Sequence, residues 1–219
     1  MELAESFFVG KYDFLEPARP DAPEGYCLIT GHWRTAQGEE QAIFQDGSGF
    51  TSLSAIGVAK AMTRLIGKRY QEFLDTIEAY YHFPLAIAKD SLMERGTASV
   101  RVKPVSGHID QAGGLAFGIR DWDNYFVFRI NALEDNAVLF EFRNGRRMQH
   151  QEVEVPIASG TWHDLRVEFS AGEIRAILNG NPMLTHQTDK PLKGYVGLWT
   201  KADSVTLFKK LDLQPGPTG

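Results

Sequence analysis

The chain has 219 residues, of which 43% are hydrophobic and 11% aromatic, enough for one large domain with a substantial buried core. The formal net charge is −5 and no block of Lys and Arg stands out, which argues against nucleic acid as a partner. No run reaches the ~18 apolar residues of a membrane span, so we expect no membrane partner either.

The N-terminal residues and the cysteine content bear on the compartment. Cys27 is the only cysteine in the sequence, which excludes an internal disulfide and a thiolate metal cluster. The sequence starts with Glu2 and Glu5 and has no basic stretch before an apolar run, so we expect no signal peptide and a cytoplasmic protein. A secreted protein trimmed of its leader would show the same features.

The first 49 residues predict a lead-in followed by two strands. Residues 1–26 mix aromatic side chains with three prolines, which favours a short strand and an irregular segment over a helix. Residues 27–34 and 41–45 are then expected as strands. The glycine-rich loop at 46–49 is not followed by the Lys-Ser/Thr of a phosphate-binding loop, so we do not expect nucleotide binding.

The period of the apolar residues changes in the segment 53–81, which we predict to be a helix or a bent helical pair. Gly67 weakens its middle, and Pro84 prevents its continuation. An amphipathic helix of this kind usually packs on the body of a domain, although a partner-binding helix is the alternative. The apolar positions at helical spacing are Leu53, Ile56, Met62, Leu65, Ile66, Phe73, Leu74, Ile77 and Tyr80 or Tyr81.

Residues 97–144 alternate apolar and polar side chains in four runs separated by Gly, Asp and Asn, the pattern of an antiparallel sheet. Successive side chains of a strand point to opposite faces, so the alternation predicts a core face and a reverse face. The predicted core face holds Ala98, Val100, Val102, Leu115, Phe117, Ile119, Phe126, Phe128, Ile130, Val138, Phe140 and Phe142. The reverse face is rich in small, aromatic and cationic side chains.

More strands with tight turns follow between residue 149 and residue 213, including turns at 170–172 and at 179–182. Many short strands at regular spacing predict an all-β sandwich. We therefore expect a single sandwich domain over residues 1–213 with a helical insertion at 53–81. The tail 214–219 has the composition of a disordered end.

Three segments carry a family resemblance: KPVSGHIDQAGGLAFGIRDWDNYFVFRINALEDNAVLFEFRNGRR (103–147), TWHDLRVEF (161–169) and GYVGLWTKADSVTLF (194–208). They resemble the concanavalin A-like lectin/glucanase superfamily, and within it the bacterial family 16 glycoside hydrolase-like or 3-keto-disaccharide hydrolase domains. The resemblance runs from about Phe83 to Leu213. It implies a jelly roll of two antiparallel sheets whose concave face is the usual carbohydrate site. The helical segment 53–81 departs from the pattern of that superfamily.

If the reverse face is the concave one, Gly114, Ala116 and Gly118 form a floor almost free of side chains, with room for a ligand. The expected ligand-binding residues around that floor are Arg101, Arg120, Tyr125, Arg129, Asn131, Glu141, Arg143, Tyr195 and Trp199. Alternatively, Arg129 and Glu141 form a cross-strand ion pair, and Tyr125 and Trp199 pack beneath the inserted helix.

The sequence supports catalysis less strongly than it supports carbohydrate binding. A glycosidase needs two carboxyl groups across the sugar bond, and Glu141 is the only acid that the alternation places on the reverse face, which makes it the weak catalytic candidate. Relatives in the superfamily often carry Ca²⁺, for which Asp121 and Asp123 are weak ligand candidates, but a polar hairpin turn is the favoured interpretation. We expect no other cofactor.

The sequence thus predicts a carbohydrate-binding protein that uses the concave face of a β-sandwich. One alternative is a glycoside hydrolase or 3-keto-glycoside-cleaving enzyme, which requires a second ionisable group in the groove. Another is a protein-interaction module whose groove is covered by helix 53–81, or which forms a homodimer.

Overall fold

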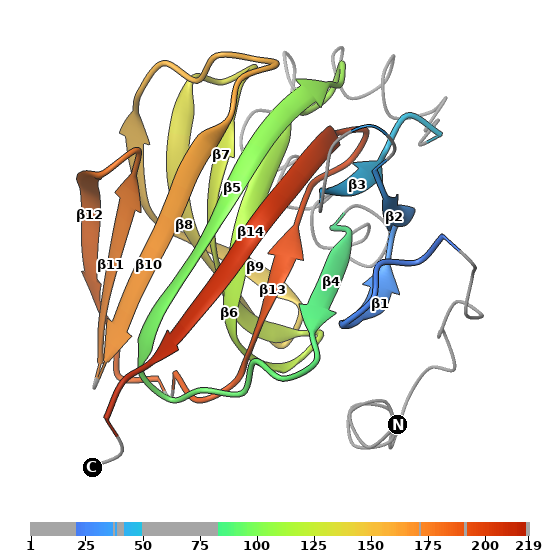
Figure 1. Cartoon of the computed structure of the whole chain (residues 1–219). Helices are drawn as coiled ribbons and strands as arrows, with labels where there is room; N and C mark the ends of the chain where they lie inside the picture. The colour runs from blue at the N-terminus through green and yellow to red at the C-terminus, as the bar shows by residue number, and fades with distance from the viewer. Residues whose placement is uncertain are drawn as a thin grey trace.

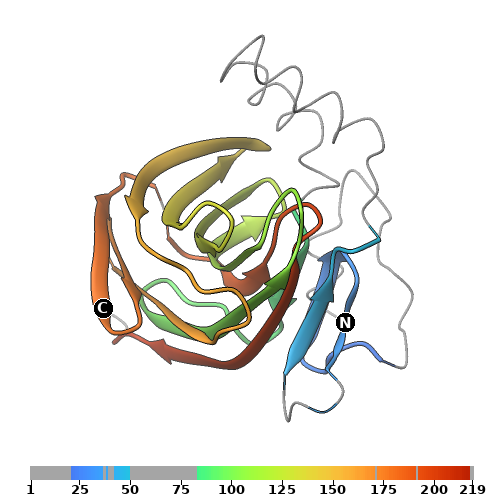
Figure 2. The same cartoon turned by 90° about the horizontal axis from the view of Figure 1, so that it is seen from above.

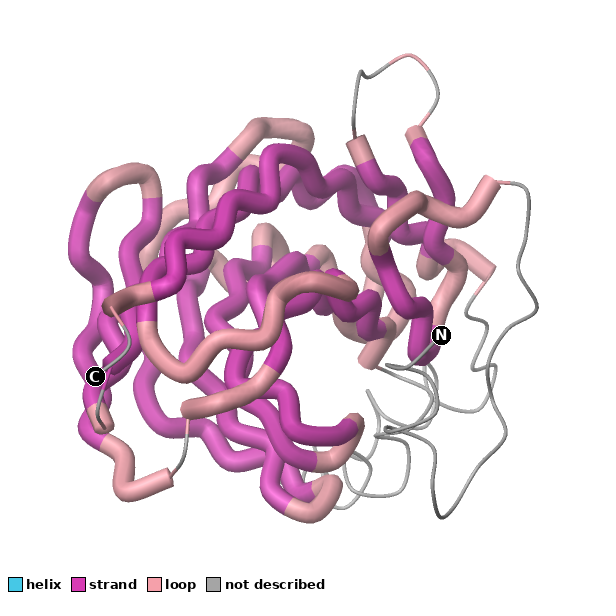
Figure 3. Tube along the Cα trace, turned by 60° about the horizontal axis from the view of Figure 1, so that its bottom comes forward, coloured by secondary structure: helices cyan, strands magenta, loops and turns pink. Residues whose placement is uncertain are grey.

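The computed structural model describes residues 21–36, 38, 42–49, 83–170, 172–190 and 192–217. Within these ranges the chain is all β, and Figure 3 shows strands and loops without a helix. No helix there is long and apolar enough to cross a membrane. The predicted helix 53–81 and most of the lead-in 1–26 lie outside the described residues.

The described strands form two antiparallel sheets of seven strands each (Figure 1), which confirms the predicted two-sheet architecture. Sheet A has the spatial order β1 (Tyr26–Thr30), β4 (Leu85–Ala88), β13 (Tyr195–Trp199), β6 (Ala112–Asp121), β7 (Asn124–Asn131), β8 (Asn136–Arg143) and β9 (Arg146–Glu154). Sheet B has the order β12 (Asn181–Gln187), β11 (Glu173–Leu178), β10 (His163–Ser170), β5 (Gly96–Ser106), β14 (Val205–Pro215), β3 (Ile43–Asp46) and β2 (Trp33–Thr35). β14 continues two residues beyond the boundary at 213 that the composition suggested.

Two hairpins show how local sequence sets the register. Asn144 and Asn179 have φ of 50° and 51°, and each is followed by a glycine with φ above 70°. Positive φ at both central residues is the type I′ geometry, whose twist matches that of the flanking strands. These Asn-Gly pairs join β8 to β9 and β11 to β12 through two-residue loops.

The main core lies between the two sheets, which Figure 2 shows from above as two curved layers. It contains the predicted inward residues of β5 and β7, and Leu115 and Phe117 of β6. Sheet B contributes Leu165, Val167 and Phe208, all fully buried. Phe117 stacks on Phe126 of its own sheet and on Phe169 of the opposite sheet, with ring centroids 5.8 and 5.4 Å apart.

The predicted core face is wrong for Ile119 and for three residues of β8. Phe126 pairs with Glu141 and Phe128 with Leu139, so Leu139 faces the inter-sheet core. Val138, Phe140 and Phe142 therefore project from the outer face of sheet A. The prediction failed because both faces of β8 are apolar, so the alternation does not show which face meets the core. A shift of one residue in the assignment places every side chain of the strand on the opposite face.

A β-bulge explains the position of Ile119. The register between β6 and β7 shifts after Phe117, and Gly118 adopts a φ of +59°. The extra residue moves Ile119 from the core face to the outer face of sheet A, opposite Tyr195. A side chain at Gly118 would also be strained by the positive φ and would lie 3.3 Å from the backbone of Leu192.

Candidate functional site

The outer face of sheet A carries a second apolar cluster, distinct from the core between the sheets. Its aromatic members pack closely: Phe83 stacks on Trp199 at 5.5 Å, and Tyr125 stacks on Phe142 at 4.4 Å. Every buried member is 6% exposed or less, which is the burial of a core rather than of an open surface. The buried members are Ile29, Phe83, Leu85, Ile87, Ala112, Ala116, Ile119, Tyr125, Val127, Val138, Phe140, Phe142 and Trp199.

A row of paired residues across this face includes the predicted small floor. Trp199 pairs with Gly114, and Gly114 pairs with Arg129 on the next strand. A Cβ at Gly114 would lie 2.8 Å from Cβ of Arg129, so no side chain fits between them. Two of the predicted ligand-binding residues, Trp199 and Arg129, thus flank a glycine floor.

Both flanking side chains hold a buried nitrogen without a hydrogen-bond partner among the described residues. These atoms are Nε1 of Trp199 and Nε of Arg129. Burial raises the pKa of the Tyr125 hydroxyl above its usual range, and the neighbouring Trp199 indole partly offsets this effect.

Arg129 does not pair with Glu141, contrary to the predicted cross-strand ion pair. Its Nη1 donates to Oδ1 of Asn136 at 2.6 Å, and its Nη2 to Oε2 of Glu134 at 2.8 Å. Burial alone would raise the pKa of the Glu134 carboxyl, but the positive charges of Arg129 and Lys201 hold it below its usual value. Arg129 is therefore held by a polar network at one end of the sheet.

Glu141 shares a face with Phe126, on the side of sheet A that faces sheet B. Both of its oxygens accept hydrogen bonds from Arg143 at 2.9 Å, and Oε2 also lies 2.9 Å from Nε2 of His150. His150 stacks on His186 of β12 at 4.1 Å. The weak catalytic candidate is thus part of an ionic cluster at the β9 and β12 edges, away from the outer face.

The remaining predicted ligand-binding residues divide between several places. Tyr195 lies on the outer face of sheet A, half-buried. Asn131 is fully buried and donates to Asp110, whose other oxygen pairs with Lys201. Arg120 is exposed near the end of β6. Arg101 belongs to β5 in sheet B, so the grouping of all these residues on one face is wrong.

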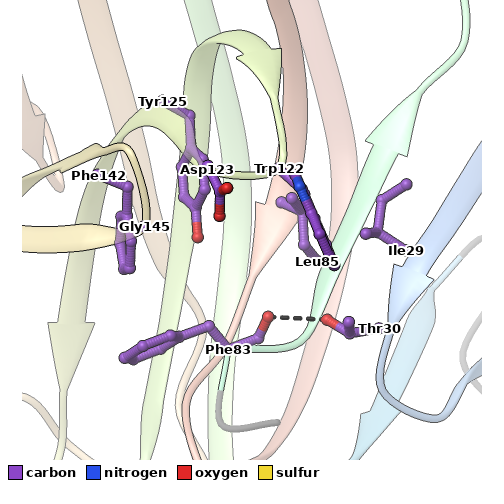
Figure 4. Close-up of a pocket in the computed structure, with 9 residues that line it drawn as sticks. All are labelled: Ile29, Thr30, Phe83, Leu85, Trp122, Asp123, Tyr125, Phe142 and Gly145. Carbon is purple, nitrogen blue, oxygen red and sulfur yellow. Dashed lines mark hydrogen bonds between the residues drawn. The ribbon is translucent and has the colours of Figure 1, made fainter. Parts of the chain in front are cut away.

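A small cavity opens at the edge of the outer face of sheet A, with a volume of about 20 Å³. Figure 4 shows the Trp122 and Tyr125 rings pointing toward the Thr30 and Phe83 end of the cavity. Thr30 donates its hydroxyl hydrogen to the carbonyl of Phe83 at 2.9 Å. The lining residues are Ile29, Thr30, Phe83, Leu85, Trp122, Asp123, Tyr125, Phe142 and Gly145.

Four segments that are distant in sequence build this cavity, and sequence reasoning identified only Tyr125 and Asp123 among its residues. Gly145 donates its backbone N–H to the carbonyl of Asp123 at 3.1 Å, which holds the β6–β7 and β8–β9 turns together. Trp122 and Phe83 lie in connections outside the strands, where alternation carries no signal. Trp122 and Phe83 line the same cavity only because the connections that carry them meet in the folded chain.

Asp121 acts as a turn-forming residue. Its Oδ1 accepts the backbone N–H of Asp123 at 2.9 Å, and both of its oxygens accept from the Asn124 amide. This is the local side-chain bonding of a polar turn. Among the described residues, no group of three or more His, Cys, Asp or Glu side chains could hold a metal ion. This geometry adds no support for Asp121 and Asp123 as Ca²⁺ ligands.

Several solved structures are similar to this chain. A carbohydrate binding module, CBM66 from Bacillus subtilis, matches 88% of this chain and 95% of its own, with 15% identity and a TM-score of 0.63. The chain has the same fold of two packed β-sheets as this module, as the family resemblance implied. Sheep galectin-11 also matches, with 15% identity over 59% of this chain and 96% of its own, at a TM-score of 0.45. A Bacillus licheniformis β-glucanase matches 61% of this chain and 72% of its own, with 12% identity and a TM-score of 0.46.

No family model matches this chain, and no curated protein sequence does. At these identities the similarity of this chain to the solved structures concerns the fold alone, and any site depends on its own residues.

Proposed function

We propose that this chain is a non-catalytic carbohydrate-binding protein whose sugar binds at the aromatic cavity on the edge of sheet A. The observation that carries the proposal is the cavity itself, which Trp122, Tyr125 and Asp123 line together. An aromatic ring covers the apolar face of a pyranose, and a carboxylate accepts hydrogen bonds from its hydroxyls. The fold shared with a protein described as a carbohydrate binding module supports the same proposal.

The size of the cavity defines how a sugar would sit. A volume of about 20 Å³ suits a water molecule or one hydroxymethyl group rather than a whole ring. We therefore place the ring at the mouth, against Trp122, with one exocyclic group directed inward past Tyr125. A site of this shape selects the end or one face of a glycan and gives weak binding, because little of the ligand is enclosed.

The carboxylates favour binding over hydrolysis. Asp123 is the one carboxylate among the residues that line the cavity. Glu141 lies on the other side of sheet A and is held by Arg143 and His150. Glycosidases of the usual type need two carboxyl groups about 5 to 10 Å apart across the sugar bond. A single acid at the mouth serves as a hydrogen-bond acceptor for hydroxyls.

The test is a thermal-shift and calorimetric screen against neutral mono- and oligosaccharides, with Ca²⁺ and EDTA arms, because a ligand of the native state raises the unfolding midpoint. Trp122→Ala should weaken binding at least 10-fold, and Asp123→Asn by a smaller factor. Trp162→Ala is the matched control, since it removes another half-buried indole from the opposite sheet. If no sugar binds, or if Trp122→Ala binds like the parent, the cavity proposal is wrong. Steady release of reducing ends would favour the hydrolase alternative.

The burial of the outer face of sheet A supports a second proposal, about the segment 53–81. We infer that this segment forms the amphipathic helix that its sequence predicts and packs on the apolar cluster. Phe83, the first described residue after it, already lies on that cluster against Trp199 and Phe142. Phe83 thus lies on the apolar cluster, shortly after the segment that we propose to pack there.

Replacing residues 53–81 by a short Gly-Ser linker tests this second proposal. The variant should expose the apolar cluster, bind a hydrophobic dye and lose several kcal/mol of stability, as expected when large side chains lose their burial. Light scattering on the parent examines the alternative occupant, a second copy of the chain. A dimeric parent whose linker variant keeps its stability would show that the partner copy covers the face.

A further inference from the structure

A polar seam closes the sandwich where the last strands of the two sheets meet. β9 is the last strand of sheet A, and β12, visible at the margin of the molecule in Figure 1, is the last strand of sheet B. These two strands are not paired in one sheet, so side chains close the seam rather than a ladder of backbone hydrogen bonds. His150 of β9 stacks on His186 of β12, with ring centroids 4.1 Å apart and an angle of 29° between the ring planes. We call this contact the histidine seam.

The strand register directs both imidazoles into the seam. His186 pairs with Ile174 of β11, whose side chain is fully buried between the sheets, so both residues lie on the inner face of sheet B. The neighbour of His186 on β11 is therefore uncharged. His150 is the extra residue of a β-bulge, at the point where the register between β8 and β9 shifts. Its ring lies 6.2 Å from that of Phe126, an inner residue of sheet A, so the two imidazoles approach each other from opposite sheets.

Charged groups reach the histidine seam from β8 and from the loop after β12. Oε2 of Glu141 lies 2.9 Å from Nε2 of His150, and this carboxylate side chain is only 4% exposed. Both oxygens of Glu141 also accept hydrogen bonds from Arg143. Asp189, in the loop after β12, pairs with Lys190 and acts on Arg143 at longer range. Among the described residues, the carboxylate that contacts the histidine pair is therefore already bound to a guanidinium.

This arrangement accommodates one imidazolium in the closed seam but not two. A proton on His150 is stabilised by the Glu141 carboxylate. A second proton on His186 would place two positive charges on rings whose centroids are 4.1 Å apart. Burial and the nearby His150 lower the pKa of His186, although Glu141 acts in the opposite direction. A histidine with a lowered pKa in the closed state binds protons more readily in the open state, so the closed seam loses stability as the pH falls below about 6.5.

We propose that the histidine seam is a pH-sensitive contact that opens in acid: protonation of both rings separates β9 from β12 while the rest of the sandwich stays folded. Each of these strands is an edge strand that pairs with one neighbour, β8 or β11. The seam can therefore open locally, with little change in the central strands β5, β6 and β7. Leu184 of β12 is buried in the main core, so opening exposes apolar surface. The seam is independent of the proposed sugar site, because none of its residues lines the cavity.

Hydrogen–deuterium exchange of the full chain at pH 7.0 and 5.0, with rates corrected for the intrinsic effect of pH, measures local opening strand by strand. In the parent, protection of the β9 and β12 amides should fall about five-fold or more at pH 5.0, since each unit by which a pKa is lowered contributes a factor of ten. Amides of β5, β6 and β7 should change less than about two-fold. His186→Phe keeps a ring against His150 but removes the second charge, so its β9 and β12 amides should be equally protected at both pH values.

A second variant and a matched control accompany this measurement. His150→Gln tests the same step independently, because an amide can still donate to Glu141 without taking up a proton. This variant should also keep its protection at pH 5.0. His108→Gln removes an exposed histidine from the connection between β5 and β6, so it should respond to acid as the parent does.

Three outcomes would overturn the proposal. Unchanged protection of β9 and β12 in the parent at pH 5.0 would show that acid does not open the seam. An equal loss of protection in the central strands would indicate global acid unfolding instead of local opening. An acid response of His186→Phe and His150→Gln equal to that of the parent would show that the imidazole pair is not its cause.

Discussion

The substitution Phe142→Ala tests whether the outer face of sheet A is a second core or an open binding surface. Phe142 is 3% exposed, although it points away from the core between the sheets. Its ring lies 4.4 Å from that of Tyr125 and 5.0 Å from that of Phe83. If the burial holds in solution, alanine at this position should cost as much as it would inside the sandwich.

The expected magnitude follows from these contacts. Burying a phenylalanine side chain contributes about 1.5 to 3 kcal/mol. Each of the two close ring pairs adds about 0.5 to 1.5 kcal/mol. The free energy of unfolding should therefore fall by about 3 to 5 kcal/mol, the range found when buried phenylalanines are truncated. A solvent-exposed ring would lose about 1 kcal/mol or less.

Urea denaturation followed by far-UV circular dichroism measures the change, with the midpoint and the slope determined for each variant. Phe128→Ala is the internal control, because Phe128 is fully buried between the sheets. Val105→Ala is the surface control, since Val105 is 39% exposed. Phe142→Ala should resemble the first control. A loss below about 1 kcal/mol, close to that of Val105→Ala, would refute the second core and return this face to the list of open sugar-binding surfaces.

Three further predictions concern polar groups. Asp203→Ala should cost about 2 to 4 kcal/mol in the same urea assay, and Asp203→Asn less, because the carboxylate accepts the backbone N–H groups of His108, Ile109 and Asp110. Burial raises the pKa of Tyr26 to about 12, so the stability this group confers below pH 10 should be lost as the pH rises from about 10 to about 12, by about 2 to 3 kcal/mol. Tyr26→Phe should show a smaller loss over that range, and an unchanged slope would contradict the assignment. Burial, with the nearby His150, lowers the pKa of His186, so stability should decline as the pH falls below about 6.5. His186→Gln should flatten this decline in pH-dependent thermal melts.

The fold class and most of the strands could be predicted from the sequence alone. Alternation with period two identified β5, β6, β7 and β10 as strands, although β6 and β7 carry apolar residues on both faces. The Asn-Gly pair at 179–180 identified the turn of one hairpin, since few other residues adopt positive φ in succession. These signals are local, so they survive without knowledge of the tertiary structure.

Alternation does not show which face of a strand meets the core when both faces are apolar, and it does not reveal the position of a β-bulge. The tertiary structure therefore decided that Phe142 lies outside and Leu139 inside, and that Gly118 turns Ile119 outward. It also separated Arg101 from Arg129, which belong to different sheets.

The sites depended on tertiary structure more than the fold did. The cavity is lined by residues from Ile29 to Gly145, so it has no pattern that is local in sequence. The partners of Arg129 and Glu141 were likewise set by register and by the meeting of sheet edges. Local periodicity fixes which residues form strands, whereas the pairing of side chains depends on distances that only the packed sandwich defines.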